Sequence, residues 1–344
     1  MFSTQADAIR NFFILPKIIV KQINNLPGPI MVFGAGGFIG FNLFQSLLLY
    51  RNDVYGISRN PKNNWRFNNF PAPIHSVLVA DLSDYEMINK LILKIKPQSI
   101  FYLAAYGAYA KQQCFHDMYE TNIKALVSLL EVLKQQTFSV FVATGSSSEY
   151  GLNCKAPKET DELIPNSHYA VSKVAAYYVL KYYGKVEHIP VIHTRLYSVY
   201  GPWEEPDRLI PTIIASGIEK RYPNLVNPDI SRDFIYVTDV ISALILLAAK
   251  RKKTWFGETF NLGTGRKTTI RELTATVKKI CQIIDEPRFG TMKNRAWDLQ
   301  DWYADPEKIT QQLAWQAKTS LKKGLEKTIA WQKSIGYQNL IQNW

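Results

Sequence analysis

The sequence predicts an α/β fold in which a doubly wound parallel sheet is followed by a smaller C-terminal α/β lobe. Two observations support this prediction. After Pro29, short apolar runs alternate with segments of helical length, and this alternation is typical of βαβ units. From about residue 202, proline and loop-like stretches become more frequent and the alternation loosens. We therefore expect the chain to leave the sheet there and build a second lobe.

The expected strands are apolar runs with few charges, which suit burial on both faces of a parallel sheet. They lie at 30–33, 53–57, 76–80, 99–103, 138–143 and 190–196. The expected helices lie at 38–51, 84–96, 118–136, 168–183, 207–218 and 269–283. Right-handed crossovers would place these helices on both faces of the sheet.

The lobes are expected to be discontinuous in the sequence. Residues 28–201 would form the first lobe. The segment "RDFIYVTDVISALILLAAK" (232–250) predicts a strand and a buried helix that return to this lobe. Residues 202–231 and 251–344 would then form the second lobe.

Residues 1–27 form an extension before the first strand. Their apolar run is interrupted by Pro16 and Lys17 and lacks a small-residue cleavage site, so it is a poor signal peptide. No apolar run in the chain reaches the ~18 residues that a membrane helix needs. We expect an amphipathic helical segment that packs on the body of the protein or on a partner subunit. Contact with a membrane surface is the alternative.

The composition narrows the class of protein. Hydrophobic residues make up 47% and charged residues 20% of the 344, an ordinary globular balance. Three widely spaced cysteines without histidine partners predict no disulfide framework and no metal site, and they favour a reducing cytoplasm. The net charge of +12 is scattered, and no nucleic-acid motif accompanies it. We therefore expect small anionic ligands and no nucleic acid.

The stretch "IMVFGAGGFIG" (30–40) predicts a dinucleotide site of the Rossmann type. Its glycines allow a tight turn and let backbone N–H groups approach a pyrophosphate at the start of the next helix. The pattern opens the first βαβ unit, which makes it more specific than a lone glycine motif. A plain strand-to-helix turn is the alternative. The predicted cofactor contacts in this loop are Gly34, Gly37, Phe38, Ile39 and Gly40.

The second strand predicts which cofactor is bound. An acid at its end would bind the ribose 2′-hydroxyl of NAD, but the sequence has Ser58 followed by Arg59. A hydroxyl and a guanidinium suit a 2′-phosphate better, so NADP(H) is preferred and NAD(H) is possible. Alternatively, Arg59 is a solvated loop residue. Asp81, followed by Leu82, would contact the adenine amino group or cap the helix that starts near residue 83.

The stretch "HYAVSKVA" (168–175) places Tyr169 and Lys173 on one helical face. A phenol with its ordinary pKa of about 10 is a poor base. The neighbouring ammonium and a nicotinamide cation would lower this pKa, which predicts an acid/base for a carbinol or ketone oxygen. Ser146, in "ATGSSSEYG" (143–151), would polarise the same oxygen. Such a tyrosine–lysine pair is usually structural when it occurs alone, but here it follows a nucleotide loop and a serine-rich strand end.

These motifs together resemble the extended short-chain dehydrogenase/reductase family, in its nucleotide-sugar branch of epimerases, dehydratases and ketoreductases. The resemblance runs in family order from about residue 30 to residue 310. Besides the motifs above, it includes "DLSD" (81–84), "YLAAYG" (102–107), Asn122, "RLYSVYGP" (195–202), "RDFIYVTD" (232–239), "NLGTG" (261–265) and "RAWDLQDWYADPEK" (295–308).

The resemblance implies roles for individual residues. Tyr169 would be the acid/base, Lys173 its electrostatic partner and ribose ligand, and Ser146 the hydroxyl that orients the sugar carbonyl. Further cofactor contacts are implied at Leu103, Ala104, Ala105 and Asn122, and substrate contacts at Ser147, Ser148, Glu149, Ser198, Arg208, Arg232 and Arg295. The substrate would be a nucleoside-diphosphate sugar.

Two arginines would hold the diphosphate of that substrate. Arg232 and Arg295 carry guanidinium groups that grip phosphate oxygens well. A salt bridge from Arg232 to Asp233 or Asp239 is the alternative. The family also forms homodimers through two helices, which would be those at 118–136 and 168–183.

The resemblance also bears on the reaction. Dehydratases of the family carry an Asp-Glu pair or a single Glu after the hydroxyl residue, but Ser147 and Ser148 occupy these positions here. Glu149 falls one place later, which in a strand reverses the face of the side chain. We therefore expect no dehydration. Glu149 would either contact the sugar or form a structural pair.

The sequence is compatible with three functions. The preferred one is an NADPH-dependent reductase of a nucleoside-diphosphate 4-keto-6-deoxy sugar, favoured by Ser58 and Arg59. The loop "EEPDRLIP" (204–211), which contains Arg208, resembles that of deoxysugar reductases, whereas Ser198 replaces the asparagine that usually contacts the pyranose. The alternative is a 4-epimerase that keeps NAD bound. A third possibility is a non-catalytic NADP-binding scaffold, against which the intact Ser146, Tyr169 and Lys173 count.

Overall fold

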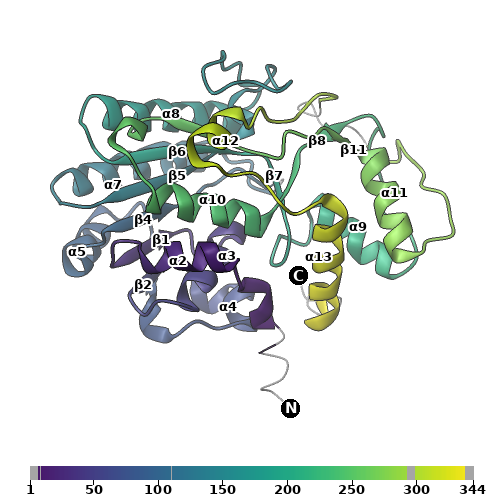
Figure 1. Ribbon diagram of the computed structural model, residues 1–344, viewed down its shortest axis with the longest axis horizontal. Helices are drawn as coiled ribbons and strands as arrows, with labels where there is room; N and C mark the ends of the chain where they lie inside the picture. The colour runs from purple at the N-terminus through teal and green to yellow at the C-terminus, as the bar shows by residue number, and fades with distance from the viewer. Residues whose placement is uncertain (1–6, 8, 110, 293–298, 338–344) are drawn as a thin grey trace.

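The computed structural model describes residues 7, 9–109, 111–292 and 299–337. Its centre is a seven-stranded sheet of order β3-β2-β1-β4-β5-β6-β10 in which all neighbours are parallel (Figure 1). The strands are β1 (Ile30–Phe33), β2 (Val54–Ser58), β3 (Val77–Val79), β4 (Ser99–Tyr102), β5 (Val140–Ser146), β6 (Val191–Leu196) and β10 (Thr259–Leu262). The predicted doubly wound parallel sheet is confirmed. Its order reverses between β1 and β4, where such sheets bind ligands at the carboxyl ends of the strands.

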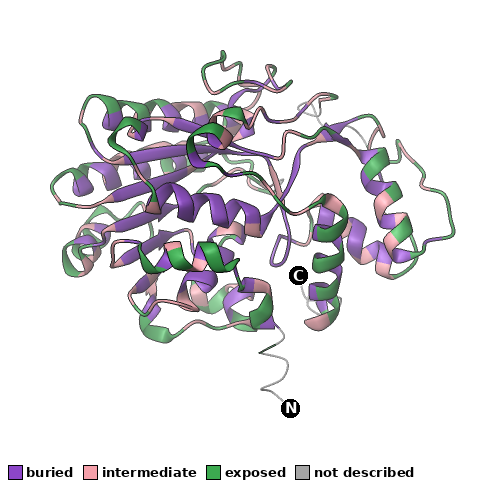
Figure 2. Cartoon of the chain, in the orientation of Figure 1, coloured by how far each residue is buried: buried purple, intermediate pink, exposed green. Residues whose placement is uncertain are grey.

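Helices cover both faces of the sheet (Figure 1). One face packs against α3 (Phe38–Leu48) and α10 (Val237–Ala249), and the other against α5 (Tyr85–Ile95), α7 (Ala125–Lys134) and α8 (His168–Lys185). Strand β1 shows why both faces are apolar. Ile30 and Val32 point into the first core and Met31 and Phe33 into the second. The central strands β1 and β4 are accordingly buried throughout their length, whereas the edge strand β3 is partly exposed (Figure 2).

Capping residues in the sequence determine where several of these helices begin. The Asp84 carboxylate accepts a hydrogen bond from Met87 N at the start of α5, and the Ser167 hydroxyl accepts one from Ala170 N at the start of α8. Helix α7 continues α6 (Phe115–Tyr119) through one π-helical turn at Glu120–Lys124. A short helix, α4 (Trp65–Asn69), follows β2.

The C-terminal lobe has its own small core beside the sheet, on the right of Figure 1. It contains helices α9 (Leu209–Ile218), α11 (Ile270–Cys281) and α13 (Leu321–Ser334). Two strand pairs connect it to the first lobe: β7 (Ser198–Tyr200) with β9 (Phe234–Tyr236), and β8 (Ser231–Arg232) with β11 (Thr268–Thr269). Helix α12 (Glu307–Leu313) packs against β10. Helix α10, within the segment 232–250, packs in the same core as α3 and the sheet.

The N-terminal extension packs on the body of the protein. Helix α2 (Lys17–Asn24) lies against α10, with Ile19 and Ile23 buried. Arg51 Nη1 donates to the backbone oxygens of Ile23 and Leu26 at 3.1 and 2.9 Å. One side of α2 is therefore covered by the body of the protein, while Ile18 stays exposed. None of the helices in the described ranges has the length and apolarity that a membrane crossing requires.

Candidate active site

The glycine-rich loop lies at the sheet edge where the strand order reverses. Gly34 has φ = +81°, and a Cβ there would lie 2.7 Å from Ala104 N. A Cβ at Gly40 would lie 2.1 Å from Gly34 O, so the loop and the first turn of α3 touch through backbone atoms alone. Gly37 is the N-cap of α3. This cradle fits a pyrophosphate, because it presents the N–H groups of a helix start with no side chain in the way.

The residues expected around the cofactor mostly gather at this edge. Phe38 and Ile39 form the first turn of α3, next to the glycine loop. Leu103, Ala104 and Ala105 follow β4 directly, and the backbone of the first two abuts Gly34. Strand β4 pairs with β1, which brings these two segments together.

Asn122, which was expected to contact the cofactor, is held by other protein groups. Its side chain is buried in the π-helical turn, where Oδ1 accepts from Tyr106 N at 2.9 Å. Its Nδ2 donates to Tyr106 O at 2.8 Å and to Ser172 Oγ at 2.9 Å. Because protein atoms hold both ends of the amide, Asn122 ties the segment after β4 to α8. This is a structural connection between site elements.

Ser58, Arg59 and Asp81 are the residues expected at the adenosine end of the cofactor. Ser58 is buried at the end of β2, and Arg59 is 66% exposed. Arg59 Nη1 lies 4.0 Å from Asp81 Oδ2. Asp81 Oδ1 accepts from the N–H and hydroxyl of Ser83 in a local turn, whereas Asp84 caps α5. Asp81 therefore does not cap this helix. Leu82 follows Asp81, half-buried, on the same turn.

Tyr169, Lys173 and Ser146 come together at the carboxyl ends of β5 and β6. The Tyr169 hydroxyl is hydrogen-bonded to Ser146, which is the last residue of β5. Lys173 is buried one turn further along α8, and its Nζ donates to Thr144 O at 3.0 Å. Thr144 lies on the same strand as Ser146, so one strand end holds both groups. The catalytic roles of the three residues stay predictions.

Burial shifts the pKa values of this pair away from the expected ones. It raises the pKa of Tyr169 to about 12, against a smaller lowering by the Ser146 hydrogen bond. It lowers the pKa of Lys173 to about 8, partly opposed by the charge of Glu149. The expected lowering of the tyrosine pKa by Lys173 is not seen, because the ammonium points to Thr144 O. The protein by itself therefore keeps the phenol protonated at neutral pH.

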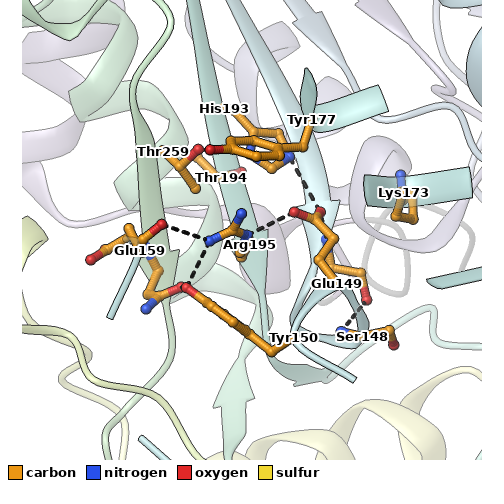
Figure 3. Close-up of polar contacts among 12 residues, drawn as sticks. Ser148, Glu149, Tyr150, Glu159, Lys173, Tyr177, His193, Thr194, Arg195 and Thr259 are labelled. Atoms are coloured by element: carbon orange, nitrogen blue, oxygen red, sulfur yellow. Dashed lines mark hydrogen bonds and ion pairs between the residues drawn. The ribbon is translucent and has the colours of Figure 1, made fainter. Parts of the chain in front are cut away.

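The serine-rich segment after Ser146 forms a 3-10 turn. Ser148 N donates to Ser146 Oγ at 3.1 Å, and Ser147 Oγ accepts from Trp302 Nε1 at 3.0 Å. Glu149 is fully buried, with its Oε2 2.7 Å from Arg195 Nε (Figure 3). Of the two alternatives for Glu149, this geometry agrees with the structural pair and not with a sugar contact.

The expected substrate residues lie where the C-terminal lobe meets the strand ends. Arg232 stacks over the Trp302 ring at 4.6 Å. The Nε1 atom of the same ring donates the hydrogen bond to Ser147. Ser198 begins β7 and is half-buried. Arg208 Nη1 donates to Ala108 O at 3.1 Å, and its charge acts on Tyr169. Arg295 lies outside the described residues.

The alternative ion pair for Arg232 does not agree with the structure. The Asp233 carboxylate is buried and accepts from the backbone N–H groups of Thr264, Gly265 and Ala304. Asp239 Oδ2 accepts from Thr319 N at 2.9 Å. Both carboxylates thus organise the backbone of the second lobe.

Arg66 is a residue at the site that the sequence did not indicate. It is buried in α4, and its guanidinium donates to Gly36 O of the glycine loop at 3.1 Å. It also donates to Trp203 O at 2.8 Å and pairs with Glu205 at 2.9 Å. Its partners Trp203 and Glu205 lie far away in the sequence, so no local signal identifies it.

Known proteins resemble this chain in sequence and in fold. The family model described as GDP-mannose 4,6 dehydratase matches residues 31–328. An uncharacterized UDP-glucose epimerase, YtcB, of Bacillus subtilis is 29% identical over 323 residues, which are 89% of this chain and 98% of that protein. The dTDP-glucose 4,6-dehydratase of Haemophilus influenzae is 26% identical over 335 residues, 88% of this chain and 97% of its own.

A solved structure extends the comparison. The UDP-glucuronic acid 4-epimerase from Bacillus cereus, in complex with UDP-glucuronic acid and NAD, superposes with a TM-score of 0.78 at 26% identity. The match covers 89% of this chain and 99% of that one. The fold and the site thus define a nicotinamide-dependent enzyme of the extended short-chain dehydrogenase/reductase type. Within this class, the chain belongs to the GDP-mannose 4,6 dehydratase family.

Proposed function

We propose that the enzyme is an NADPH-dependent reductase of the 4-keto group of a nucleoside-diphosphate 4-keto-6-deoxy sugar. The observation that carries this proposal is the end of β2, where Ser58 and Arg59 stand in place of an acid. The pair between Arg59 and Asp81 is exposed and 4.0 Å long, so it is weak. Its guanidinium is accessible to a ribose 2′-phosphate, which it would bind by charge-assisted hydrogen bonds.

The protonation state of Tyr169 supports the reductive direction. With its pKa raised to about 12, the phenol keeps its proton at neutral pH and can donate it to the carbonyl oxygen of the sugar. Ser146 Oγ would hydrogen-bond the same oxygen and stabilise the charge that develops on it. The Lys173 ammonium would hold the cofactor ribose. Bound NADPH would supply the hydride.

The residues after Ser146 support reduction over dehydration. Elimination of water needs an acid/base beside the hydroxyl residue. Ser147 and Ser148 carry no carboxyl group, and the Glu149 carboxylate is enclosed by Arg195 and His193. No ionisable acid at positions 147–149 therefore faces the place where the sugar would bind.

The C-terminal lobe would hold the nucleoside diphosphate. Arg232, stacked on Trp302, and Arg208, at the start of α9, would supply guanidinium groups from this lobe. Such groups suit a diphosphate. The B. cereus epimerase holds UDP-glucuronic acid, which supports a nucleotide sugar as the substrate class.

A 4-epimerase with bound NAD is the second candidate, because two of the proteins compared above are described as epimerases. The two candidates are separated by incubating the enzyme with 4-keto-6-deoxy sugars linked to dTDP, UDP, GDP and CDP, with NADPH present. We expect one of them to consume NADPH stoichiometrically. Conversion of UDP-glucose or UDP-glucuronic acid without net cofactor consumption would contradict the reductase and establish the epimerase.

We further propose a homodimer through α7 and α8. Helix α8 carries an exposed apolar row that consists of Val171, Tyr178 and Tyr182, continued by the C-cap residue Val186, at spacings that keep it on one face. Sedimentation velocity should show a dimer for the wild type and a monomer for Tyr178→Lys. A wild-type monomer at micromolar concentration would contradict the proposal.

A further inference from the structure

A buried charged network surrounds the Glu149 carboxylate, three residues after Ser146 in the sequence (Figure 3). Its centre is Glu149, whose side chain is inaccessible to solvent. Glu149 Oε2 lies 2.7 Å from Arg195 Nε, and Oε1 lies 3.4 Å from His193 Nε2. The same Oε1 accepts a hydrogen bond from Ser146 N at 2.9 Å. One carboxylate thus contacts two side chains of β6 and the backbone of the residue that ends β5.

The surroundings fix this carboxylate in place. Arg195 lies between the rings of Tyr150 and Tyr177, at 4.5 and 4.7 Å, and its Nη1 donates to the Tyr150 hydroxyl at 2.9 Å. His193 Nδ1 is 3.1 Å from Thr259 Oγ1. Every neighbour of Glu149 is therefore itself held by a hydrogen bond or by ring packing, which leaves the carboxylate little freedom.

Gly145 shows that the backbone is adapted to this contact. A Cβ at Gly145 would lie 2.1 Å from Glu149 Oε1 and 2.1 Å from His193 Nε2. Any larger residue in this position of β5 would displace the carboxylate or the imidazole. The strand is therefore built to let Glu149 and His193 meet immediately before Ser146.

The network connects to the reacting groups in two ways. The first is geometric: Glu149 holds Ser146 N, and Ser146 Oγ accepts from Ser148 N, so both ends of Ser146 are fixed within one capping box. The second is electrostatic. The negative charge of Glu149 favours the ammonium form of Lys173 and disfavours the phenolate of Tyr169.

We propose that Glu149 is a positioning residue of the active site, which orients Ser146 through its backbone and keeps Lys173 charged and Tyr169 protonated. This inference rests on the proposed roles of Ser146, Tyr169 and Lys173. It assigns a role to Glu149, which lies one residue after the positions that carry the acids in dehydratases of the family. The Glu149 carboxyl group would support hydride transfer through Ser146, Lys173 and Tyr169, without contacting the sugar.

The charges that act on this group come from every element packed around it. Arg195 and His193 face Glu149 from β6, and Lys173 and Tyr169 act on it from α8. Burial lowers the pKa of His193, which keeps the imidazole neutral at pH 7. The Glu149 carboxylate is thus the negative charge that interacts with both cations, Arg195 and Lys173.

The test is the Glu149→Gln variant. Its kcat is measured as a function of pH, and its affinity for NADPH is measured alongside. A glutamine has one acceptor oxygen, so either Ser146 N or Arg195 Nε loses its partner. We expect kcat to fall by about 10- to 100-fold. With the negative charge removed, Lys173 and Tyr169 both lose their protons more easily, so the alkaline limb should move to lower pH by at least about 0.5 unit. NADPH affinity at pH 7 should stay within a few-fold.

Two further variants make the result specific. Glu159→Gln changes a neighbouring half-buried acid, whose Oε1 accepts a hydrogen bond from Asn261 N, and should leave the pH profile unchanged. Glu149→Leu combined with Arg195→Met removes both charges and fills the space with apolar groups, so this pair keeps the test valid if Glu149→Gln does not fold. It should keep the loss of kcat, because Ser146 N still lacks its acceptor, and show a smaller pH shift.

The following results would overturn the inference. They are an unchanged kcat in Glu149→Gln, a reduced kcat with no shift of the pH profile, or recovery of the wild-type rate in the double variant. The wild type is assayed first with both 4-keto sugars and epimerase substrates. Failure to reduce any 4-keto sugar refutes the proposed function alone, and the variants are then compared on epimerisation, which uses the same three groups.

Discussion

Arg66 and Glu205 form a buried ion pair, with 2.9 Å between Nη2 and Oε1, that joins the glycine loop to the loop before α9. Removal of the guanidinium would leave the carboxylate buried and unpaired. We expect Arg66→Met to lower the free energy of unfolding by about 3–5 kcal/mol in urea denaturation. Arg59→Met, at an exposed cation nearby, should change it by less than about 0.5 kcal/mol. A small effect at Arg66 would show that the pair does not hold the two loops together.

Tyr169→Phe removes the proposed proton donor and keeps the ring. We expect kcat to fall by about 10²–10⁴-fold, while NADPH affinity changes by no more than a few-fold. The matched control is Tyr178→Phe, on the exposed face of the same helix, which should keep full activity. Turnover of Tyr169→Phe at the wild-type rate would remove this residue from the mechanism.

Glu204 makes the stability dependent on pH. Burial raises its pKa to about 8 from an ordinary value of 4.5, so the folded protein keeps a proton that the unfolded chain releases. The associated stability is complete below pH 4.5 and is lost as the pH rises toward 8. Glu204→Gln should be the more stable protein at pH 8, by on the order of 1–4 kcal/mol, and similar to the wild type near pH 4.5.

Urea unfolding of both proteins at the two pH values measures this difference. The exposed Glu219→Gln serves as the control and should show no such dependence. Equal effects of Glu204→Gln at the two pH values would mean that its carboxyl group titrates normally.

Phe13 anchors the N-terminal extension. It is fully buried, and its ring packs against Phe41, Phe70 and Trp203. We expect Phe13→Ala to cost about 3–5 kcal/mol of unfolding free energy, because it leaves a cavity next to α3. Ile14→Ala, at an exposed neighbour, should cost less than about 0.5 kcal/mol. Equal effects of the two variants would mean that the extension does not stabilise the body.

The sheet could be predicted because its strands are continuous apolar runs. The run at 30–33 coincides with β1, and the run at 190–196 differs from β6 by one residue. The strand expected at the start of 232–250 corresponds to β9, but β10, β7 and the pairing of β7 with β9 were not expected. These strands have three or four residues each, and their partners are remote in the chain, so tertiary pairing and not local pattern defines them.

The active site likewise contains residues that could be located from the sequence and one that could not. Tyr169, Lys173 and Ser146 could be found because they stand at a helix start and a strand end that the apolar pattern locates. Glu149 could not be placed, because the chain leaves the strand at Ser146 and enters a 3-10 turn. The alternation of faces in a strand no longer applies there, and the direction of the side chain depends on Arg195, on another strand.

The central claim is that this enzyme uses NADPH as an exchangeable cofactor. The most direct measurement is the identity and amount of nucleotide released when the purified protein is denatured, with NADPH and NADH titrated into the stripped protein. We expect little bound nucleotide and tighter binding of NADPH, with a preference that falls by about 10-fold or more in Arg59→Ala and not in the distant Arg271→Ala. Stoichiometric release of NAD from the wild type, or equal affinity for the two cofactors, would contradict the claim and favour the epimerase.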